Sequence, residues 1–449
     1  MFKIFKSRGE FLFFSILAII SIIATGLVYA LHFNGPPIRS DGLGYYVYLP
    51  SVFVYNDISM NEFIDAYSKH YNDPPTDYWN GVYKYENTGN YLDKYPIGVA
   101  VMSLPFFLLA HIGTLAISQF SGVPPDGFTD PLYHAAQTFS GLFYGLLGLL
   151  ILKRILDKYF KPEVVYLTLI AVMFGTNLFH YFTYDAVFSH VYSFFLFTLF
   201  LYLTIKWYSN PNKLNSLLIG ATTGLIAIVR PTNLVVVLFF LLFGLSINGL
   251  GTQIRQRAAL YLRKYKKILL ISFAAIAVVS IQIIYWYIIT GRLFVYSYTD
   301  EYFDFKNPQI LNVLFSIRKG LFFWCPVLLF SIPGFYLIRN KIKGFSLPTI
   351  IFFFINAYIV SSWWSWWYGG GFGMRALIEI FPFLALPMAA TFERIFVLRN
   401  RYAKGVLILF ALVLIIFTTL MMIQYWRGLI PIDNSGISTI INALLNRSI

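Results

Sequence analysis

Phe11–Leu31, FLFFSILAIISIIATGLVYAL, is followed after a short connection by Arg39–Ser51, RSDGLGYYVYLPS, and these two stretches predict the fold. The first is an apolar run of the length that an α-helix needs to cross a bilayer, about 20 residues. The second places one carboxylate, Asp41, beside a small-residue turn and a band of tyrosines that includes Tyr45. The pair therefore predicts a membrane helix followed by an acid at the bilayer surface.

The composition extends this prediction to the whole chain. Of its 449 residues, 58% are hydrophobic and 12% are charged, and the mean hydropathy is +0.66. Soluble domains carry about 25% charged residues, so we expect an all-α, polytopic membrane protein that forms a single domain over residues 1–449. The first apolar run is too long for a typical signal peptide and no clear cleavage site follows it, which favours a retained anchor.

Charge and cysteine usage exclude several classes of protein. The net charge is +14, but Lys and Arg cluster in short loops, which indicates membrane topology and not nucleic-acid binding. The only cysteine, Cys325, lies in an apolar run, so we expect no disulfide framework and no Cys-based metal site. The sequence has no Walker P-loop, HExxH, GxSxG or EF-hand pattern, which argues against an ATP-driven pump or a membrane zinc protease.

The positive-inside rule decides how many apolar runs cross the membrane. The twelve runs lie near residues 11–31, 97–118, 133–152, 164–182, 190–207, 215–229, 231–248, 268–290, 320–338, 346–362, 377–395 and 405–425. If all of them cross, the basic groups at 153–161, 255–267, 339–343 and 399–404 fall outside, against the rule. If the run 97–118 is re-entrant or lies along the outer interface, all four groups fall inside.

We therefore expect about 11 transmembrane helices with the N-terminus in the cytoplasm. The expected external parts are a loop over residues 32–132, which holds juxtamembrane and re-entrant helices, and a short tail over 427–449. This topology gathers the unusual polar residues on the outer face. The inner face carries almost nothing but Lys and Arg.

Asp41 is the first candidate for chemistry on that outer face. Partial removal from water would raise the pKa of its carboxyl and make it a better general base toward a hydroxyl group. The alternative interpretation is structural, because Ser40-Asp41-Gly42 is also an ordinary helix start in which Asp41 would be the N-cap.

Two cations are candidates for binding an anion. Lys94, in the segment DKYPIG, either contacts a phosphate near the headgroups or is a snorkelling lysine. Arg230 lies at the tip of a short hairpin, and a 15-residue helix spans only about 22 Å. Arg230 should therefore sink below the outer surface and face a cavity, where it binds an anionic ligand or forms a structural ion pair, with Asp185 as the candidate partner.

Two further groups of residues complete the candidate site. Asp185 and His190 flank the outer ends of neighbouring runs, as a second acid with a hydrogen-bonding partner or as structural caps; their spacing is a weak metal signal. The stretch Trp363–Arg375, WWSWWYGGGFGMR, offers Trp366 and Trp367 for stacking on a sugar and Arg375 for a phosphate. An aromatic belt with a flexible turn is the alternative. We expect the acidic loop with Asp300, Glu301 and Asp304 to be solvated, with contact to an acceptor or a cation as the alternative.

With these residues in place, the chain resembles the GT-C superfamily of polytopic glycosyltransferases, and in plan it is similar to protein O-mannosyltransferases and lipid A aminoarabinose transferases. Those families carry an acid in the first external loop and a Lys/His-Pro segment before the second true span. Here SDGLGYY with Asp41 and DKYPIG with Lys94 occupy these places. The chain departs from the pattern in having Asp-Gly where the families often have Asp-Glu, and in lacking the large C-terminal domain of some relatives.

The resemblance implies an enzyme that moves a hexose or pentose from a polyprenyl-phosphate carrier to a hydroxyl of a glycan, lipid or protein. Asp41 would be the general base of an inverting displacement on the outer face of a bacterial inner membrane. Lys94, Arg230 and Arg375 would stabilise the carrier phosphate; no nucleotide is needed, and a divalent metal is possible because relatives differ on this. The alternative is a transporter or flippase of a lipid-linked saccharide, whose polar groups should line both faces; a third is a non-catalytic membrane subunit.

Overall fold

The twelve apolar runs all contain helices in the computed structural model, which describes residues 5–30, 36–72, 81–433 and 435–446. Seven helices have the length and composition to cross a membrane: α1 (Arg8–Ala30), α5 (Gly98–Ser121), α6 (Pro131–Leu156), α9 (Ser189–Ser209), α13 (Tyr265–Thr290), η4 with α18 (Arg375–Ile380 and Phe381–Phe396) and α19 (Arg401–Trp426). The five shorter apolar helices are α7 (Pro162–Phe174), α10 (Lys213–Val229), η1 with α11 (Pro231–Val236 and Val237–Leu242), η2 with α16 (Pro326–Phe330 and Ser331–Leu337) and α17 (Ser346–Ser361).

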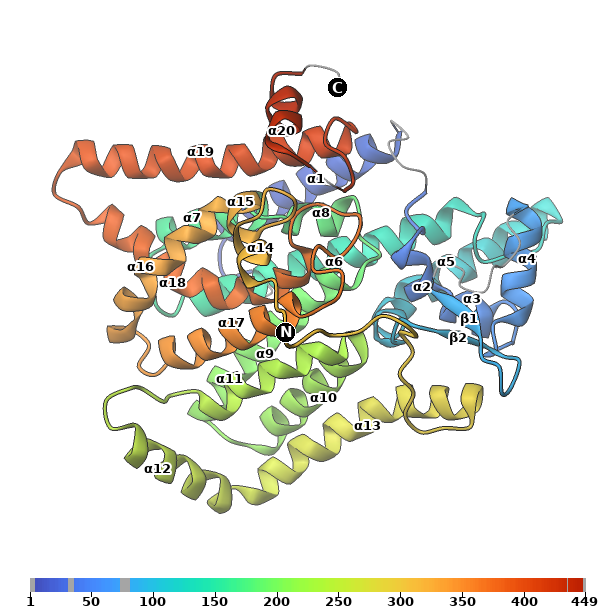
Figure 1. Ribbon diagram of the computed structural model, residues 1–449, viewed down its shortest axis with the longest axis horizontal. Helices are drawn as coiled ribbons and strands as arrows, with labels where there is room; N and C mark the ends of the chain where they lie inside the picture. Colours follow the sequence, from blue (N-terminus) through green and yellow to red (C-terminus); the bar gives the residue numbers. More distant parts are fainter. Residues whose placement is uncertain (1–4, 31–35, 73–80, 434, 447–449) are drawn as a thin grey trace.

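The remaining elements are short and mostly connect or cover the bundle (Figure 1). They are α2 (Asp41–Tyr46), α3 (Tyr48–Phe53), α4 (Asn61–Tyr71), β1 (Val82–Lys84), β2 (Tyr91–Asp93), α8 (Leu178–Thr183), α12 (Leu250–Arg263), α14 (Ile310–Phe315), α15 (Leu321–Trp324), η3 (Ile338–Asn340) and α20 (Ile437–Leu444). Parts of the expected external segments, residues 32–35, 73–80, 434 and 447–449, and the last residue of the first apolar run, Leu31, lie outside the described residues.

The segment between α1 and α6 folds as a small unit with its own apolar core at one end of the bundle, on the right in Figure 1. Its hairpin pairs β1 with β2 antiparallel, with Val82 opposite Asp93. The turn between the strands is fastened to the bundle, because the Thr88 hydroxyl donates to the carbonyl of Ile289 at the end of α13 (2.8 Å). The hairpin thereby fixes the residues that directly follow Asp93.

Helix α5, on the run expected to be re-entrant, is one unbroken helix of 24 residues and not a loop that turns back. It runs antiparallel to α6, with Tyr144 of α6 bonded to the carbonyl of Met102 (2.9 Å) and Tyr133 bonded to His111 (2.7 Å). The contacts thus involve the half of α6 that starts at Pro131, and α5 ends near that start. Helix α5 also has the length and composition of a membrane span, so the parity argument, by which this run does not cross, stays a prediction.

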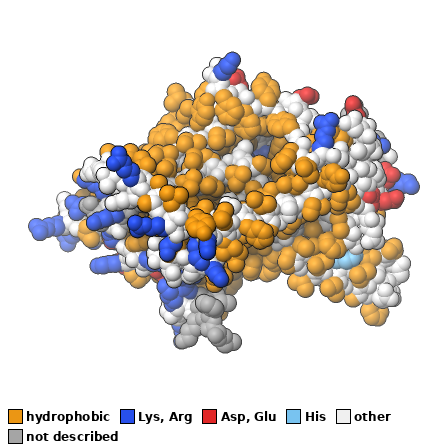
Figure 2. All heavy atoms as spheres, turned by 90° about the horizontal axis from the view of Figure 1, so that it is seen from below, with side chains coloured by type: hydrophobic (Ala, Val, Ile, Leu, Met, Phe, Trp, Pro, Cys, Tyr) orange, Lys and Arg blue, Asp and Glu red, His pale blue; other side chains and the backbone are white. Residues whose placement is uncertain are grey.

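The four basic groups gather at one end of the molecule. Lys341 donates to the carbonyl of Tyr159 (2.9 Å) and pairs with Glu393 (2.7 Å), near the end of α18 that leads into the group at 399–404. In the fourth group, Arg257 donates to the carbonyl of Phe243, and the N–H of the next residue, Gly244, donates to the carbonyl of Gly344 (3.0 Å). Figure 2 shows Lys and Arg side chains concentrated on the left, the end where α12 and the α18–α19 connection lie in Figure 1. The middle of the molecule is mostly hydrophobic in that view.

A proline ends a short helix at the opposite end of the bundle. Helix α10 stops at Val229 because Pro231 has no N–H to donate, and Arg230 between them is extended (φ −153°, ψ 109°). Arg375 is the first residue of η4, which continues directly into α18. Arg230 therefore lies at the end of one helix and Arg375 at the beginning of another.

Candidate functional site

A cavity of about 530 Å³ lies where these helix ends meet. Its wall combines the start of α2, the residues after β2, the start of α9, the α10–η1 junction, the segment after α13 and the turn after α17. Polar and aromatic side chains on the wall include Asp41, Tyr45, Lys94, Tyr95, His190, Arg230, Tyr298, Glu301, Trp363, Trp364, Tyr368 and Arg375. The cavity therefore brings together six residues singled out in the sequence: Asp41, Tyr45, Lys94, His190, Arg230 and Arg375.

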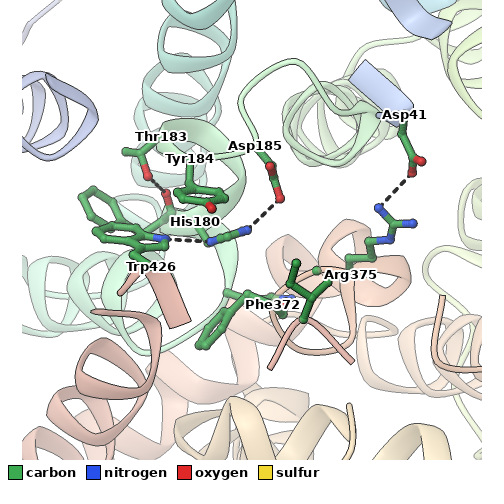
Figure 3. Close-up of polar contacts among 12 residues, drawn as sticks. Asp41, His180, Thr183, Tyr184, Asp185, Phe372, Arg375 and Trp426 are labelled. Atoms are coloured by element: carbon green, nitrogen blue, oxygen red, sulfur yellow. Dashed lines mark hydrogen bonds and ion pairs between the residues drawn. The ribbon is translucent and has the colours of Figure 1, made fainter. Parts of the chain in front are cut away.

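Asp41 is the first residue of α2 and is held by two partners on the wall. Its Oδ2 pairs with Nη1 of Arg375 (2.9 Å), an interaction drawn in Figure 3, and its Oδ1 accepts a hydrogen bond from the Tyr95 hydroxyl (2.8 Å). The N-cap of α2 is Ser40, and no side chain caps the helix, so the interpretation of Asp41 as an N-cap is wrong. Tyr95 was not singled out, although it lies within the quoted DKYPIG segment.

The expected rise in the pKa of Asp41 is also wrong. Burial acts in the expected direction, but Arg375, the hydrogen bond from Tyr95, Lys94 and His190 outweigh it and hold the pKa below its usual value. Asp41 is therefore an ionised acceptor in this state, with its charge stabilised mainly by one arginine. A ligand that draws Arg375 away would make the same carboxylate a stronger base.

Lys94 directly follows β2 and forms the second ion pair on the wall. Its Nζ lies 2.9 Å from Oε1 of Glu301, and its charge lies over the Tyr95 ring at 5.0 Å. Glu301 thus belongs to the cavity wall, where the sequence had suggested a solvated loop. The neighbouring Asp93 is 1% exposed, and burial raises its pKa well above the usual value. Its Oδ1 accepts from the N–H of Tyr95 (2.8 Å), which shapes the turn that presents Lys94.

Arg230 forms the third ion pair, and its partner differs from the one expected. Its Nη1 lies 3.1 Å from Oε1 of Glu379 and 3.2 Å from Nδ1 of His190, whereas the expected partner, Asp185, pairs elsewhere. Glu379 is fully buried in η4 and was missed in the sequence. A single carboxylate inside an apolar run was the signal for it, because such a group needs a partner within the protein.

Asp185 lies behind the cavity wall and not on it. Its Oδ1 pairs with Nη2 of Arg39 (3.0 Å), and its Oδ2 lies 2.9 Å from Nε2 of His180. Burial opposes ionisation, but His180 and Arg39 hold the pKa of Asp185 below its usual value. Tyr45, by contrast, is on the wall, and its hydroxyl donates to Ser189 at the start of α9 (3.0 Å). Neither Arg39 nor His180 was singled out in the sequence.

The tryptophans divide into two pairs. Trp363 and Trp364 line the cavity, while Trp366 and Trp367, proposed for sugar stacking, lie against Arg318, whose guanidinium is 3.8 Å from the Trp367 ring centre. After both pairs, the chain turns through Tyr368, which has a positive φ (57°), and the glycines that follow. Tyr368 itself lines the cavity, so this stretch contributes three of the aromatic side chains on the wall, Trp363, Trp364 and Tyr368.

The described residues do not fit a resident divalent metal at this site. No group of three His, Cys, Asp or Glu side chains lies close enough together to hold a metal ion within the described ranges. The carboxylates on the cavity wall are Asp41 and Glu301, and each is engaged by a cation. We therefore derive no step through a metal.

Comparisons with known proteins give a likeness of fold. No family model matches the sequence, and no curated protein matches it. Among solved structures, ArnT from Cupriavidus metallidurans bound to undecaprenyl phosphate matches with a TM-score of 0.51 and 11% sequence identity. The match covers 96% of this chain and 74% of that chain. The fold resembles that of ArnT. This confirms the expected fold class, an all-α polytopic integral membrane protein.

Proposed function

We propose that the chain is a membrane glycosyltransferase that moves a sugar from a polyprenyl-phosphate carrier to an acceptor hydroxyl. The observation that carries this proposal is one cavity that holds a carboxylate, Asp41, together with three cations. ArnT, which shares the fold, binds undecaprenyl phosphate in its solved structure, which supports a carrier of the same class. The acceptor is a glycan, lipid or protein, and the sugar is a hexose or pentose.

The reaction is a single inverting displacement. The acceptor oxygen attacks the anomeric carbon, the bond from that carbon to the phosphate oxygen breaks, and the electron pair leaves with the carrier phosphate. Asp41 takes the proton of the acceptor hydroxyl. Arg375 and Lys94 stabilise the charge that develops on the phosphate, because fixed cations in a partly dry cavity act strongly on such a charge.

In this proposal, binding of the donor prepares the base. Arg375 is paired with Asp41 before the donor binds (2.9 Å), and a phosphate offers this guanidinium a second anionic partner. As Arg375 turns toward the phosphate, the pKa of Asp41 rises. Burial favours the protonated carboxyl, and it then acts without the arginine that had opposed it. Trp363, Trp364 and Tyr368 provide ring faces for the sugar.

The proposed orientation follows from the basic end of the molecule. By the positive-inside rule, the end rich in Lys and Arg would face the cytoplasm together with the N-terminus, and the cavity would open on the outer face. The proposed membrane is a bacterial inner membrane. Nucleic acid has no part in the reaction, and the donor arrives within the bilayer.

The test is transfer by the purified protein in vesicles. Radiolabelled polyprenyl-phosphate hexoses and pentoses are incubated with cell-envelope acceptors, and we expect label in the acceptor together with free polyprenyl phosphate. The alternative, a flippase of a lipid-linked saccharide, predicts movement of intact label across the vesicle with no release of the carrier. Movement without transfer for every donor would overturn the proposal.

A further inference from the structure

Two ion pairs of opposite polarity flank one strained residue beside the cavity. Arg39 pairs with Asp185 (3.0 Å) on one side, and Asp41 pairs with Arg375 (2.9 Å) on the other. Between them Ser40 has φ 48° and ψ −135°. Residues other than glycine rarely adopt such a positive φ. Such strain persists only where the surroundings hold the chain in place.

A chain of hydrogen bonds stands behind Arg39. The Trp426 indole Nε1 donates to Nδ1 of His180 (2.9 Å), and because an indole can only donate, this ring nitrogen is the acceptor. Nε2 of His180 then carries the hydrogen and donates to Oδ2 of Asp185 (2.9 Å), as Figure 3 shows. His180 is 0% exposed, Asp185 7% and Trp426 8%. Both carboxylate oxygens of Asp185 are thus engaged by protein groups.

Aromatic stacking reinforces this chain. The Tyr184 ring contacts both the guanidinium of Arg39, 4.8 Å from its centre, and the Trp426 indole, which is parallel to it within 3° at 6.2 Å. The Tyr29 hydroxyl of α1 also donates to the Tyr184 carbonyl (2.8 Å). The α8–α9 connection and the end of α19 therefore neutralise the charge of Arg39 and fix the direction of its side chain.

We propose that Asp185, His180 and Trp426 are positioning residues for the general base. They hold Arg39, Arg39 holds Ser40 in its strained conformation, and this places Asp41 on the cavity wall. The role rests on the proposed function. It also removes Asp185 as a second acid, because Asp185 lies off the wall and has no oxygen left for substrate.

The first test separates positioning from simple stability. Asp185→Asn introduces an amide donor against Arg39 or His180, and we expect kcat to fall about 100-fold, the usual effect of a catalytic group misplaced by about 1 Å. Binding of undecaprenyl phosphate should be unchanged or tighter, because Arg375 is freed. Trp426→Phe keeps an aromatic ring at this place but removes the indole N–H and one of its two rings, and a smaller fall in kcat is expected. It also serves as the test if Asp185→Asn does not fold.

Glu10→Gln is the matched control, since Glu10 is a buried acid (1% exposed) paired with Arg154 (3.0 Å) at the basic end. It should lower thermal stability and leave kcat unchanged. Equal losses of kcat in Glu10→Gln and Asp185→Asn would overturn the positioning role.

The second test uses Ser40→Gly as a rescue. Glycine adopts a positive φ without steric cost, so the double variant Ser40→Gly/Asp185→Asn should recover kcat to within about 10-fold of wild type. A purely structural role of Asp185 predicts no recovery, and that outcome would contradict the proposal.

Thermal unfolding gives a readout that needs no activity. Ser40→Gly should raise Tm by about 2 °C in the wild type, where strain is relieved, and by less in Asp185→Asn, where it has already relaxed. An equal rise in Tm in both backgrounds would contradict the proposal that Asp185, through Arg39, holds Ser40 in its strained conformation. If the wild type transfers no sugar, the proposed function fails, while this stability cycle still decides whether Asp185 holds the Ser40 conformation.

Discussion

Two hollows in this molecule differ in size and in chemistry. The larger, about 860 Å³, is a groove between α1, α6 and α9 lined mainly by aliphatic and aromatic side chains, with Lys6 and Arg154 at the basic end. The smaller, about 530 Å³, has cations and carboxylates in its wall. The groove can be filled by hydrocarbon alone, whereas the cavity needs a polar ligand. The difference teaches that convergent ionisable groups, and not volume, locate the chemistry.

Charge balance sharpens this comparison. In the groove, Arg154 pairs with Glu10 (3.0 Å) and Lys6 with Asp157 (3.5 Å), and both acids belong to the basic end of the bundle. In the cavity, the acid–cation pairs face a common space, so that a phosphate can replace a carboxylate as partner of a cation. The following experiments test whether function follows this contrast.

The largest effect is expected from Asp41→Asn. An amide cannot take a proton from the acceptor hydroxyl, so transfer should fall about 1,000-fold, while binding of undecaprenyl phosphate is kept. Asp57→Asn is the control from the same external segment, because the Asp57 carboxylate accepts from the backbone N–H groups of Ser59 (2.8 Å) and Glu62 (3.0 Å) and does not line the cavity. Unchanged transfer in Asp41→Asn would remove Asp41 from the mechanism.

Glu379→Gln should have the next largest effect, on stability. It leaves Arg230 without its carboxylate in a buried site, and breaking such a pair typically costs about 3 kcal/mol. Thermal unfolding in detergent measures the loss. Adding Arg230→Gln to Glu379→Gln should cost less than the two single variants together, because the pair is removed as a unit. Additive losses would show that the two side chains do not depend on each other.

Arg375→Gln should weaken the donor side of the cavity. Loss of one charge-assisted contact lowers affinity for undecaprenyl phosphate by about 30-fold, equivalent to about 2 kcal/mol. Arg375→Lys keeps the charge but not the forked geometry, so its affinity should lie between that of the wild type and that of Arg375→Gln. Arg154→Gln, in the apolar groove, is the matched control and should leave this affinity unchanged. If both arginines mattered equally, the contrast between the two hollows would fail.

How far the sequence predicts this molecule depends on the range of the interactions involved. The twelve apolar runs are local, and each contains a helix; Pro231 likewise ends α10 where a local rule requires it. Arg230 and Glu379 lie 149 residues apart, so their pairing depends on how the bundle closes. The sequence reveals that an intramembrane cation needs an acid, but not which acid.

The candidate site shows the same division. Burial of Asp41 was expected from its place at the membrane surface, but the sign of its pKa shift depends on Arg375, which only the folded bundle brings to 2.9 Å. Four tryptophans between residues 363 and 367 were visible, but the sequence does not reveal which pair faces the cavity. That choice depends on contacts between distant parts of the chain, since Trp367 lies against Arg318 (3.8 Å) while Trp363 and Trp364 line the cavity.

The pH dependence should be small in the wild type. Asp41 acts only when ionised, so kcat/KM falls only below its pKa, which Arg375 and Tyr95 hold under the usual value. We expect a profile without an acidic limb between about pH 5 and pH 8. In Arg375→Gln the main opposing charge is gone and burial remains, so the acidic limb should move to higher pH. An acidic limb near neutral pH in the wild type would contradict the pairing of Asp41 with Arg375.

The smallest effect is expected when the apolar groove is filled. Ala18→Phe places a ring in the groove between α1 and α6, where hydrocarbon contact is the only demand, so transfer should change by less than about 2-fold. The measurement is the same vesicle assay at saturating and at limiting donor. A large rise in KM for the donor, with kcat unchanged, would mean that the carrier chain runs through this groove. The groove would then be part of the site, and the contrast between the two hollows would describe the two ends of one ligand, its hydrocarbon and its phosphate.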